Sequence, residues 1–388
     1  MANVSSSNGL EKRPKLRFPG FDEPWKMVSL QDISEYRKNK ICVSKLKYIS
    51  TENMLQNFAG IIPYTSEEDI SGVEFCVGDT LLANIRPYLR KAWLATHDGA
   101  CSTDVLALCP LDITPAFLNN IIEQDRFIDY VMSGVKGSKM PRGDKAHILA
   151  YETAIPSLLE QEKINSFMQL LHQRIAKIQM QIELLKKYKR GVNNQILSQI
   201  DNSYNCRLGS VCEIVGGGTP DTLHTEYWGN TVEWFTPSEI GKTKYVNNSV
   251  RKLSDIGLDN SSAKLLPIGT VLLTTRATLG EMSIAKRECS TNQGFQSLIP
   301  HTDRVSSEYL YYMQIIIKPW CEKYASGNTF REISKSALSD CIIPIPDRAR
   351  QEQIVKLLSS IDMLIGAAES ISMSLSKIRH GLMQQLFI

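Results

Sequence analysis

The stretch that decides the fold is residues 155–197, IPSLLEQEKINSFMQLLHQRIAKIQMQIELLKKYKRGVNNQIL, because the chain carries it twice. Residues 345–387, IPDRARQEQIVKLLSSIDMLIGAAESISMSLSKIRHGLMQQLF, align with it without a gap, and ten of the 43 positions are identical. A period of 190 residues is far longer than a solenoid repeat, so each copy is a whole domain with the segment that follows it. The sequence therefore predicts two similar halves related by pseudo-two-fold symmetry.

Both copies show the heptad spacing of a coiled-coil seam. Pro156 suits a helix entry and the polar residues 201–203 suit its end, so the first helix should hold roughly 40 residues and be about 60 Å long. The predicted pairing residues are Ile164, Leu171, Ile175, Ile178, Ile182, Leu185, Ile354, Ile361, Ile365, Leu375 and Leu382. Since each helix follows an equivalent domain, symmetry would lay the two antiparallel. Packing of each helix on its own half is the open alternative.

These patterns predict an α+β fold in which two similar globular domains are joined by two long antiparallel helices. The expected segments are a basic disordered tail (1–20), a first globular domain (21–157), a first helix (158–204), a second domain (205–346) and a second helix (347–388).

Three short stretches match between the two globular halves. They are Thr80–Ala83 with Val271–Thr274, Cys101–Thr103 with Cys289–Thr291, and the pair of Gly137–Met140 and Lys145–Ile148 with Gly327–Phe330 and Lys335–Leu338. Between these anchors the two sequences diverge. A shared scaffold that carries two different recognition surfaces would give this pattern.

Composition excludes several classes of protein. The chain has 388 residues, 43% of them hydrophobic, which is enough for two cores. Nine cysteines without a C-x-x-C pair argue against a disulfide framework or structural zinc and favour the reduced cytoplasm. No apolar run is long enough for a membrane span. The net charge of +3 is too small to indicate nucleic-acid binding by itself.

Catalytic motifs are missing from the sequence. The chain has no Pro-Pro dipeptide for an adenine methyltransferase loop, no acidic-x-Lys nuclease motif, no phosphate-binding GxxxxGK[ST] loop and no G-x-S-x-G elbow. Its six histidines show no metal-ligand spacing. We therefore expect a non-catalytic chain that holds no metal or cofactor.

Cationic, aromatic and polar side chains near glycines form several local clusters, of the kind used for phosphate contacts and base readout. Arg86 recurs as Arg276 and Lys145 as Lys335, which favours these four over ordinary surface charges, although anchoring of a loop would also explain a matched pair. The candidate DNA contacts are Arg37, Lys38, Lys40, Arg86, Tyr88, Arg90, Lys91, Lys139, Arg142, Lys145, Lys242, Lys244, Tyr245, Arg276, Thr278, Asn328, Arg331 and Lys335.

From about Lys15 onward the sequence resembles the specificity subunits of type I restriction-modification systems. The resemblance is carried by Lys15–Phe21 with Trp25, Gly217–Pro220 with Tyr227 and Trp228, Trp234–Ser238, Thr291–Gln296, and the helix ends 191–197 and 381–387. The first half has Ser102-Thr-Asp104 where the second has the fuller Thr291-Asn-Gln-Gly294.

The resemblance implies two target-recognition domains that read the halves of a bipartite site in double-stranded DNA, with two helices that set the spacer. It implies docking of two modification subunits, which would bind S-adenosylmethionine and methylate adenine, and of restriction subunits with ATP and Mg²⁺. Two alternatives stay open, a coiled-coil scaffold that binds only proteins and a nuclease or methyltransferase with an unfamiliar site.

Overall fold

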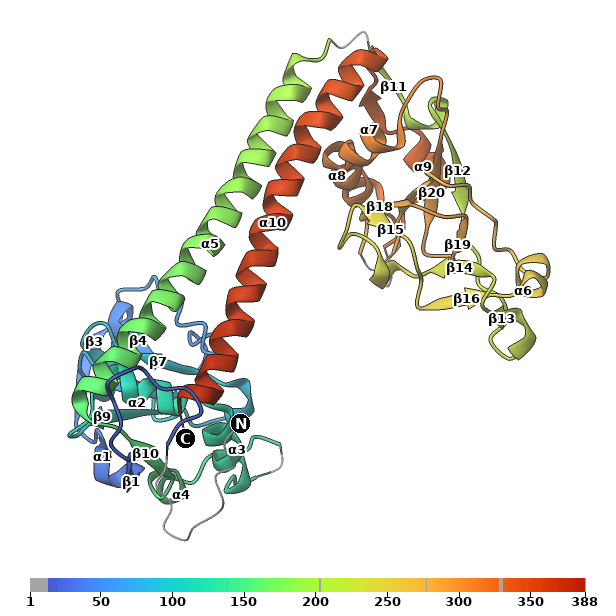
Figure 1. Ribbon diagram of the computed structural model, residues 1–388. Coiled ribbons are helices and arrows are strands. Elements are labelled where there is room, and N and C mark those ends of the chain that lie inside the picture. Colours follow the sequence, from blue (N-terminus) through green and yellow to red (C-terminus); the bar gives the residue numbers. More distant parts are fainter. Residues whose placement is uncertain (1–12, 138, 202–203, 277, 328–330, 388) are drawn as a thin grey trace. The chain divides into compact units, whose positions relative to one another are not determined.

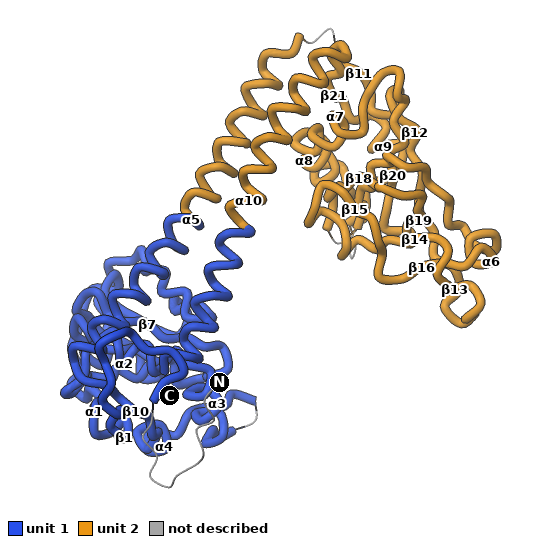
Figure 2. The backbone as a smooth tube through the Cα atoms, in the orientation of Figure 1, with its two compact units in different colours: residues 1–179, 370–388 blue, residues 180–369 orange. Residues whose placement is uncertain are grey.

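The computed structural model describes residues 13–137, 139–201, 204–276, 278–327 and 331–387. Two compact units are formed, unit 1 from residues 1–179 and 370–388 and unit 2 from residues 180–369 (Figure 2). Two long helices, α5 (Leu158–Gln199) and α10 (Arg348–Leu386), contribute a segment to each unit (Figure 1). The predicted α+β fold with two long helices is confirmed. No helix of the described residues is long and apolar enough to cross a membrane.

Unit 1 contains three small sheets, with strand orders β1-β10, β2-β9-β6-β7 and β3-β5-β8-β4. The strands are β1 (Lys26–Ser29), β2 (Ser34–Tyr36), β3 (Lys40–Ser44), β4 (Tyr48–Ile49), β5 (Asp69–Phe75), β6 (Thr80–Ala83), β7 (Ala92–Leu94), β8 (Gly99–Cys101), β9 (Val105–Pro110) and β10 (Glu152–Ile155). The short helices are α1 (Leu30–Ile33), α2 (Pro115–Ile122), α3 (Asp125–Ser133) and α4 (Lys145–Leu149), with 3₁₀ turns η1 (Lys45–Lys47) and η2 (Pro87–Leu89).

Unit 2 repeats this plan with strand orders β11-β21, β12-β20-β17-β18-β15 and β13-β16-β14-β19. Its strands are β11 (Asn205–Arg207), β12 (Cys212–Gly216), β13 (Trp228–Gly229), β14 (Val232–Phe235), β15 (Tyr245–Val246), β16 (Arg251–Leu253), β17 (Val271–Leu273), β18 (Met282–Ala285), β19 (Cys289–Thr291), β20 (Gln296–Pro300) and β21 (Ile342–Pro344). The helices are α6 (Asp255–Asp259), α7 (Ser307–Tyr312), α8 (Gln314–Tyr324) and α9 (Lys335–Ser339), and the 3₁₀ turns are η4 (Leu208–Ser210), η5 (Thr225–Tyr227) and η6 (Pro237–Glu239).

The duplication extends to single main-chain hydrogen bonds. The turn before the matched strands β6 and β17 is closed by Gly78 N–H on Ala95 O and by Gly269 N–H on Ala285 O, both 2.9 Å. Both glycines have φ near +90°, +91° and +89°, which glycine adopts without steric cost. The hydrophobic match between these strands therefore reflects a shared backbone.

One predicted match is wrong by two residues. In the parallel pairs β4·β8 and β14·β19, the residue after the strand donates to the neighbouring strand, from Ser102 N to Ile49 O (2.8 Å) and from Asn292 N to Phe235 O (3.1 Å). Cys101 is therefore equivalent to Thr291, and not to Cys289. The repeated letters Cys-Ser-Thr were misleading because side-chain identity is conserved less strictly than strand register.

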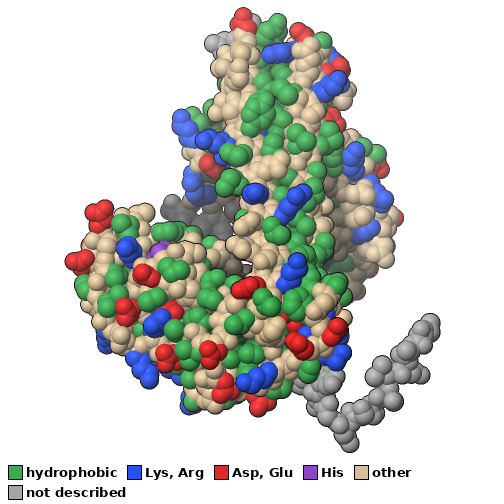
Figure 3. Space-filling view, turned by 60° about the vertical axis from the view of Figure 1, so that its left-hand side comes forward, with side chains coloured by type: hydrophobic (Ala, Val, Ile, Leu, Met, Phe, Trp, Pro, Cys, Tyr) green, Lys and Arg blue, Asp and Glu red, His purple; other side chains and the backbone are tan. Residues whose placement is uncertain are grey.

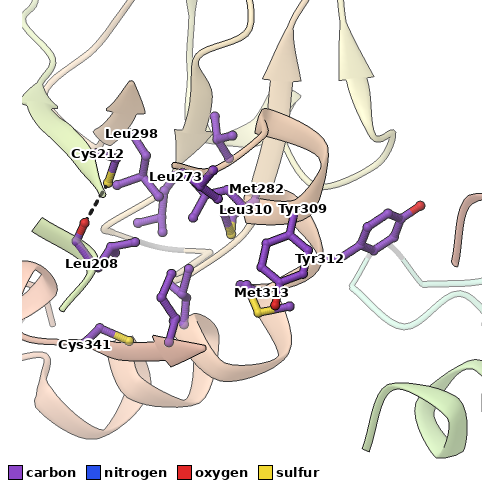
Figure 4. Packing of buried hydrophobic residues seen from close by; sticks show 14 of the residues in the cluster. Leu208, Cys212, Leu273, Met282, Leu298, Tyr309, Leu310, Tyr312, Met313 and Cys341 are labelled. Atoms are coloured by element: carbon purple, nitrogen blue, oxygen red, sulfur yellow. Dashed lines mark hydrogen bonds between the residues drawn. The ribbon is translucent and has the colours of Figure 1, made fainter. Parts of the chain in front are cut away.

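Apolar residues of the sheets, the short helices and the long helices together form the cores. The largest cluster of unit 2 joins β12, β17, β18 and β20 to α7 and α8 and to the adjacent segments of α5 and α10. Figure 4 shows the fully buried Tyr309 beside Met313 and Leu310, and Cys212 donating its thiol proton to Leu208 O at 3.2 Å. In unit 1, Phe117 and Phe127 lie in a cluster with Ile164 and Met168 of α5, Met383 of α10 and Phe387 just after it.

A buried glutamine fixes the start of each long helix. Gln161 accepts hydrogen bonds from Thr114 N (2.9 Å) and Thr114 Oγ1 (3.1 Å) and donates to Pro156 O (3.0 Å). Gln351, its equivalent, accepts from Ser306 N (3.2 Å) and donates to Arg304 O (2.8 Å) and Pro346 O (2.9 Å). Each amide thus ties the first turn of a long helix to the loop before α2 or α7.

Within each unit the segments of α5 and α10 run antiparallel. In unit 2, Lys189 pairs with Asp362 at 2.5 Å and Lys186 with Glu369 at 2.9 Å, so residue numbers fall on α5 as they rise on α10. The predicted pairing residues Ile164, Ile175, Ile182, Ile354, Ile361 and Ile365 are buried, and Leu171, Ile178, Leu185, Leu375 and Leu382 are half-buried. Several of them also pack on the globular part of their unit. Pairing of the helices and packing on the globular halves therefore occur together.

Part of the predicted disordered tail is ordered. Arg17 forms a two-fold ion pair with the buried Glu160 of α5 (2.9 and 2.8 Å), and Phe18 packs edge-on against Phe167 at 5.6 Å. Leu16 N–H donates to Gln385 O of α10 at 3.0 Å. Disorder is therefore wrong for residues 13–20, because a cation and an aromatic ring find partners on the long helices; residues 1–12 lie outside the described part of the chain.

Candidate nucleic-acid interface

Three stretches of unit 2 that are far apart in the sequence meet at one end of its sheets. Gly218 N–H donates to Thr291 O (2.9 Å), Asn292 N–H donates to Phe235 O (3.1 Å), and Trp234 Nε1 donates to Gly218 O (3.0 Å). The loops 217–220, 236–239 and 292–295 therefore lie side by side. They present Ser238 and Gln293 to solvent and Thr219 and Asn292 at half exposure.

Glycine is required at two positions of this junction. A Cβ atom on Gly217 would lie 1.9 Å from Asn292 O, and one on Gly218 would lie 2.3 Å from Ala263 N. Both obstacles are backbone atoms, which cannot move without breaking the loop contacts. The glycine cluster thus serves close packing of loops and not a phosphate cradle.

The loop after β6 or β17 lies against a second loop in both units. This second loop is a hairpin closed by a pair of main-chain hydrogen bonds, between Lys136 and Arg142 in unit 1 (2.9 and 3.0 Å) and between Ser326 and Glu332 in unit 2 (3.0 and 2.9 Å). Arg86 N–H donates to Pro141 O in this hairpin at 2.8 Å. The predicted residues Arg86, Lys139 and Arg142 are thereby brought to one surface of unit 1, and Arg276 and Arg331 to the equivalent surface of unit 2.

Charge differs between these equivalent surfaces. Arg276 is paired with Glu332 at 2.9 Å, whereas unit 1 has Arg142 at the position of Glu332. Arg142 instead pairs with Asp104 at 3.1 Å, and no partner is present for the Arg86 side chain among the residues that the structure describes. Unit 1 therefore presents an unneutralised arginine where unit 2 presents an ion pair.

Some predicted contacts are engaged inside the chain. Arg37 binds both carboxylate oxygens of the buried Asp79 (2.9 and 3.1 Å), and this hydrogen bonding raises the pKa of its guanidinium. Lys91 Nζ donates to Thr51 O at 2.6 Å. Arg331 donates to Glu322 O and Ala325 O. These side chains hold loops in place in the described conformation.

Lys244 lies against α10 and Tyr245 against α7 rather than at the loop surface. Lys244 Nζ donates to Ser359 Oγ of α10 (3.1 Å) and to Tyr312 Oη (3.3 Å), and burial lowers its pKa. Tyr245 Oη donates to Glu308 at 3.3 Å. Both therefore help to attach the β15 edge to α7 and α10.

The remaining predicted residues lie at exposed positions, and their contact with DNA stays a prediction. They are Lys38, Lys40, Tyr88, Lys139, Lys145, Lys242, Thr278 and Lys335; Lys145 and Lys335 are the first residues of α4 and α9. Arg90 forms an ion pair with Asp125 at the start of α3. Asn328 lies outside the described residues.

Groups suited to catalysis do not gather in the part of the chain that is described. Burial raises the pKa of the Cys101, Cys212, Cys289, Cys321 and Cys341 thiols to about 12, so they are protonated and poor nucleophiles at neutral pH. Among these residues, no group of three or more His, Cys, Asp or Glu side chains could hold a metal ion.

Lys189 and Arg379 stand 190 residues apart, at the same position of the two heptad seams, and sequence reasoning missed the acidic partners of these two seam cations. Lys189 pairs with Asp362, whose Oδ2 also accepts from Tyr312 Oη at 2.8 Å. Arg379, at the equivalent position, pairs with Glu123 at the end of α2. Burial raises the pKa of Glu123 against the opposing effect of Arg379. The cations themselves were visible as a repeated break in the apolar seam, but Glu123 carries no local signal.

The fold and the loop surfaces define a class of protein, a duplicated α+β chain that presents two unlike loop surfaces and holds them on paired helices. Residues 201–373 match the family model described as the type I restriction modification DNA specificity domain. Over these residues the chain is therefore similar to the specificity subunits of type I restriction-modification systems.

Individual relatives agree with this placement. The type I restriction enzyme MjaIX specificity subunit of Methanocaldococcus jannaschii is 35% identical over 47% of this chain and 43% of its own length. The putative MjaX specificity subunit of the same organism is 22% identical over 94% of this chain and 93% of its length. The solved structure of the type I S subunit from M. genitalium superposes with a TM-score of 0.60 at 13% identity, covering 97% of this chain and 99% of that one, and so shares the fold.

Proposed function

We propose that the chain is the DNA-reading, non-catalytic subunit of a type I restriction-modification complex, in which each unit reads one half of a bipartite duplex site. The observation that carries this proposal is the pair of loop surfaces on one duplicated framework. Equivalent positions hold Arg142 and Glu332, and Asp104 and Gly294, while the main-chain hydrogen bonds around them are the same. Such surfaces suit two different half-sites, whereas identical surfaces could read only a symmetric one.

The long helices are the proposed docking surface for two modification subunits. Apolar side chains remain exposed along them although the seam itself is covered, and Figure 3 shows hydrophobic side chains along the helices. The exposed apolar residues are Leu158, Leu159, Leu170, Met180, Leu184, Tyr188, Leu357, Met363, Leu364, Ile371, Met373 and Ile378. Exposed apolar stripes of this extent suit protein partners. The modification subunits bring S-adenosylmethionine and the methylating site, and restriction subunits bring ATP and Mg²⁺.

The low net charge fits a shared DNA interface. A net charge of +3 on 388 residues leaves little excess positive charge for contacts with phosphates, and such contacts dominate the affinity of most DNA-binding proteins. The modification subunits would close on the duplex and add the rest, so the isolated chain should bind DNA weakly. All nine cysteines are free, which fits action in the cytoplasm.

Mapping of methylated adenines across the host genome, with and without this gene, tests the proposal. A bipartite methylated motif should disappear with the gene and return on complementation. Replacement of residues 21–157 by the corresponding domain of another specificity subunit should then change one half of the motif and leave the other intact. A motif that survives deletion of the gene, or whose two halves both survive the replacement, contradicts the proposal.

We further propose that the length of the helices sets the unread spacer between the half-sites. Gln179 and Glu369 occupy equivalent positions of α5 and α10, so four residues, about one helical turn, can be inserted after each without disturbing either unit. The spacer of the methylated motif should lengthen while both half-sites stay the same. An unchanged spacer in a stable double insertion would refute this role.

A further inference from the structure

An unusual turn supports the unpaired arginine of unit 1. The turn η2 (Pro87–Leu89) is flanked by Arg86 and Arg90. Both flanking residues have a left-handed backbone, with φ 52° at Arg86 and φ 55° at Arg90. Two more left-handed residues, Asn57 (φ 56°) and Phe58 (φ 58°), lie in the adjoining loop. Bulky residues rarely adopt this conformation, and strained residues that occur together point to a functional constraint.

Hydrogen bonds join the two strained loops to each other. Asn57 N–H donates to Leu89 O at 3.2 Å, and Phe58 N–H donates to Arg90 O at 2.8 Å. The Arg90 guanidinium lies 5.3 Å from the centre of the Phe58 ring. The left-handed backbone of the 57–58 loop therefore turns two amide protons toward the carbonyls of the turn.

Asp125 at the start of α3 holds the same turn from the other side. It forms an ion pair with Arg90, lies 3.3 Å from His380 Nε2 of α10, and accepts a long hydrogen bond from Gln384 at 3.5 Å. Hydrogen bonding and charge from Arg90 overcome the effect of burial, so the pKa of Asp125 is lowered and its carboxylate is charged at neutral pH. The turn is thus connected to the long helix within unit 1.

Among the described residues of unit 2, the equivalent loop has no arginine–aspartate pair and is attached to α8 instead by Gln314 Nε2, which donates to Gly280 O at 3.0 Å. The position of Arg90 is occupied by Gly280, which also has a positive φ (76°) and donates to Thr274 O at 2.8 Å. Glycine adopts this conformation freely, so the backbone path alone does not need an arginine. Arg90 is therefore not needed for the backbone conformation of the turn. Its side chain instead attaches the turn to Asp125 and makes it rigid.

We propose that Arg86 reads a guanine in the half-site of unit 1, and that Asn57, Phe58 and Asp125 are positioning residues that hold its turn. This inference rests on the proposed function. Arginine pairs with the O6 and N7 acceptors of guanine through two parallel hydrogen bonds, which require a fixed direction of approach. Arg276 of unit 2 has its guanidinium bound to Glu332 and so reads no guanine in this way.

The test uses the host strain from which the gene has been deleted, complemented with variants of the full chain, and methylated adenines are mapped across the genome. Arg86→Ala should lower the preference for G·C at one position of one half-site by roughly 10- to 100-fold, seen as new methylation at sites with another base there. Arg86→Lys should lose most of the same preference, since lysine keeps the charge but not the planar fork. Lys26→Ala, which removes another exposed cation of unit 1, is the matched control and should leave the motif unchanged.

Asp125 variants test the positioning role. Asp125→Asn should broaden the same base position by about tenfold, the lower end of the loss for a missing contact, and Asp125→Glu should restore the preference because it keeps the charge. A merely structural role would lower the amount of folded chain, measured by immunoblot, without changing any base preference.

The outcomes separate this inference from the proposed function. If deletion of the gene removes no bipartite motif, the proposed function is wrong. If the motif depends on the gene but Arg86→Ala lowers methylation equally at all sites, Arg86 contacts phosphate and the inference is overturned. If Arg86 sets a base preference and Asp125→Asn does not alter it, the positioning role is overturned.

Discussion

Gln351 allows the attachment of a long helix to its unit to be tested quantitatively. Its side chain is 1% exposed and satisfies three main-chain groups, Ser306 N–H, Arg304 C=O and Pro346 C=O. Gln351→Leu leaves all three without this partner beside a buried side chain. At about 1 kcal/mol for each unsatisfied buried group, the free energy of unfolding of unit 2 should fall by ~3 kcal/mol.

Hydrogen–deuterium exchange read by mass spectrometry locates the effect. A loss of ~3 kcal/mol corresponds to roughly 100-fold faster exchange wherever opening is coupled to the lost anchor. Faster exchange should appear in residues 304–314 and 342–356, with unit 1 unaffected. Gln353→Leu, an exposed glutamine two residues further on the same helix, should change stability by less than about 0.5 kcal/mol. Equal effects of the two variants, or faster exchange mainly in unit 1, would refute the assigned role of Gln351.

Three further predictions follow from ionisable groups. The exposed Cys42 should react with iodoacetamide at pH 8, whereas Cys101, with a pKa of about 12, should react only after unfolding, as mass spectrometry of the labelled peptides would show. Lys189→Asp should destabilise unit 2 in urea titrations by about 1 kcal/mol, since the pair is partly exposed, and adding Asp362→Lys should restore most of the loss; no recovery would contradict the pairing. The pKa of Glu123 is raised above its ordinary value of 4.5 in the folded state, so above pH 4.5 the native chain binds more protons than the unfolded chain. The free energy of unfolding should therefore fall as the pH rises above 4.5. Glu123→Gln should flatten this fall, and an unchanged pH profile of stability would contradict the assignment.

The sequence predicts this fold best where the signal is local or repeated. The heptad rows predict α5 and α10 because helical period is set by neighbouring residues, and the 190-residue shift predicts the equivalence of β6 with β17 and of α4 with α9. Gln161 and Gln351 also carried a usable signal, since an identical polar residue in both copies of an otherwise variable segment needs a structural reason. The repeat does not reveal what these glutamines bind. Gln161 binds a loop 47 residues away in the sequence, and Gln351 binds one 45 residues away.

The candidate site was less predictable, because a charged residue looks the same in the sequence whether it is free or paired. Arg37 meets Asp79, 42 residues away, and Lys244 meets Ser359, 115 residues away, so neither engagement follows from nearby residues. Arg86 and Arg276 are a matched pair by sequence, yet among the described residues Arg276 has an acidic partner and Arg86 has none. The difference lies in one residue of the facing hairpin, Arg142 or Glu332, whose proximity depends on the folded loops.

The seam cations show how duplicated positions acquire different roles. Lys189 and Arg379 are equivalent, and both would be costly in an apolar seam without a partner. On the facing helix, Lys189 meets Asp362, whereas the position equivalent to Asp362 in the first copy is His172. Arg379 therefore takes its acid from Glu123 of the globular part, at the residue that follows α2. In unit 2 the cation joins helix to helix, and Tyr312 of α7 donates to the same carboxylate, whereas in unit 1 the cation pairs directly with the globular part. Glu123 lies two residues before Asp125, which holds the Arg86 turn through Arg90, so in unit 1 the partner of the seam cation and the support of the turn are neighbours in the sequence.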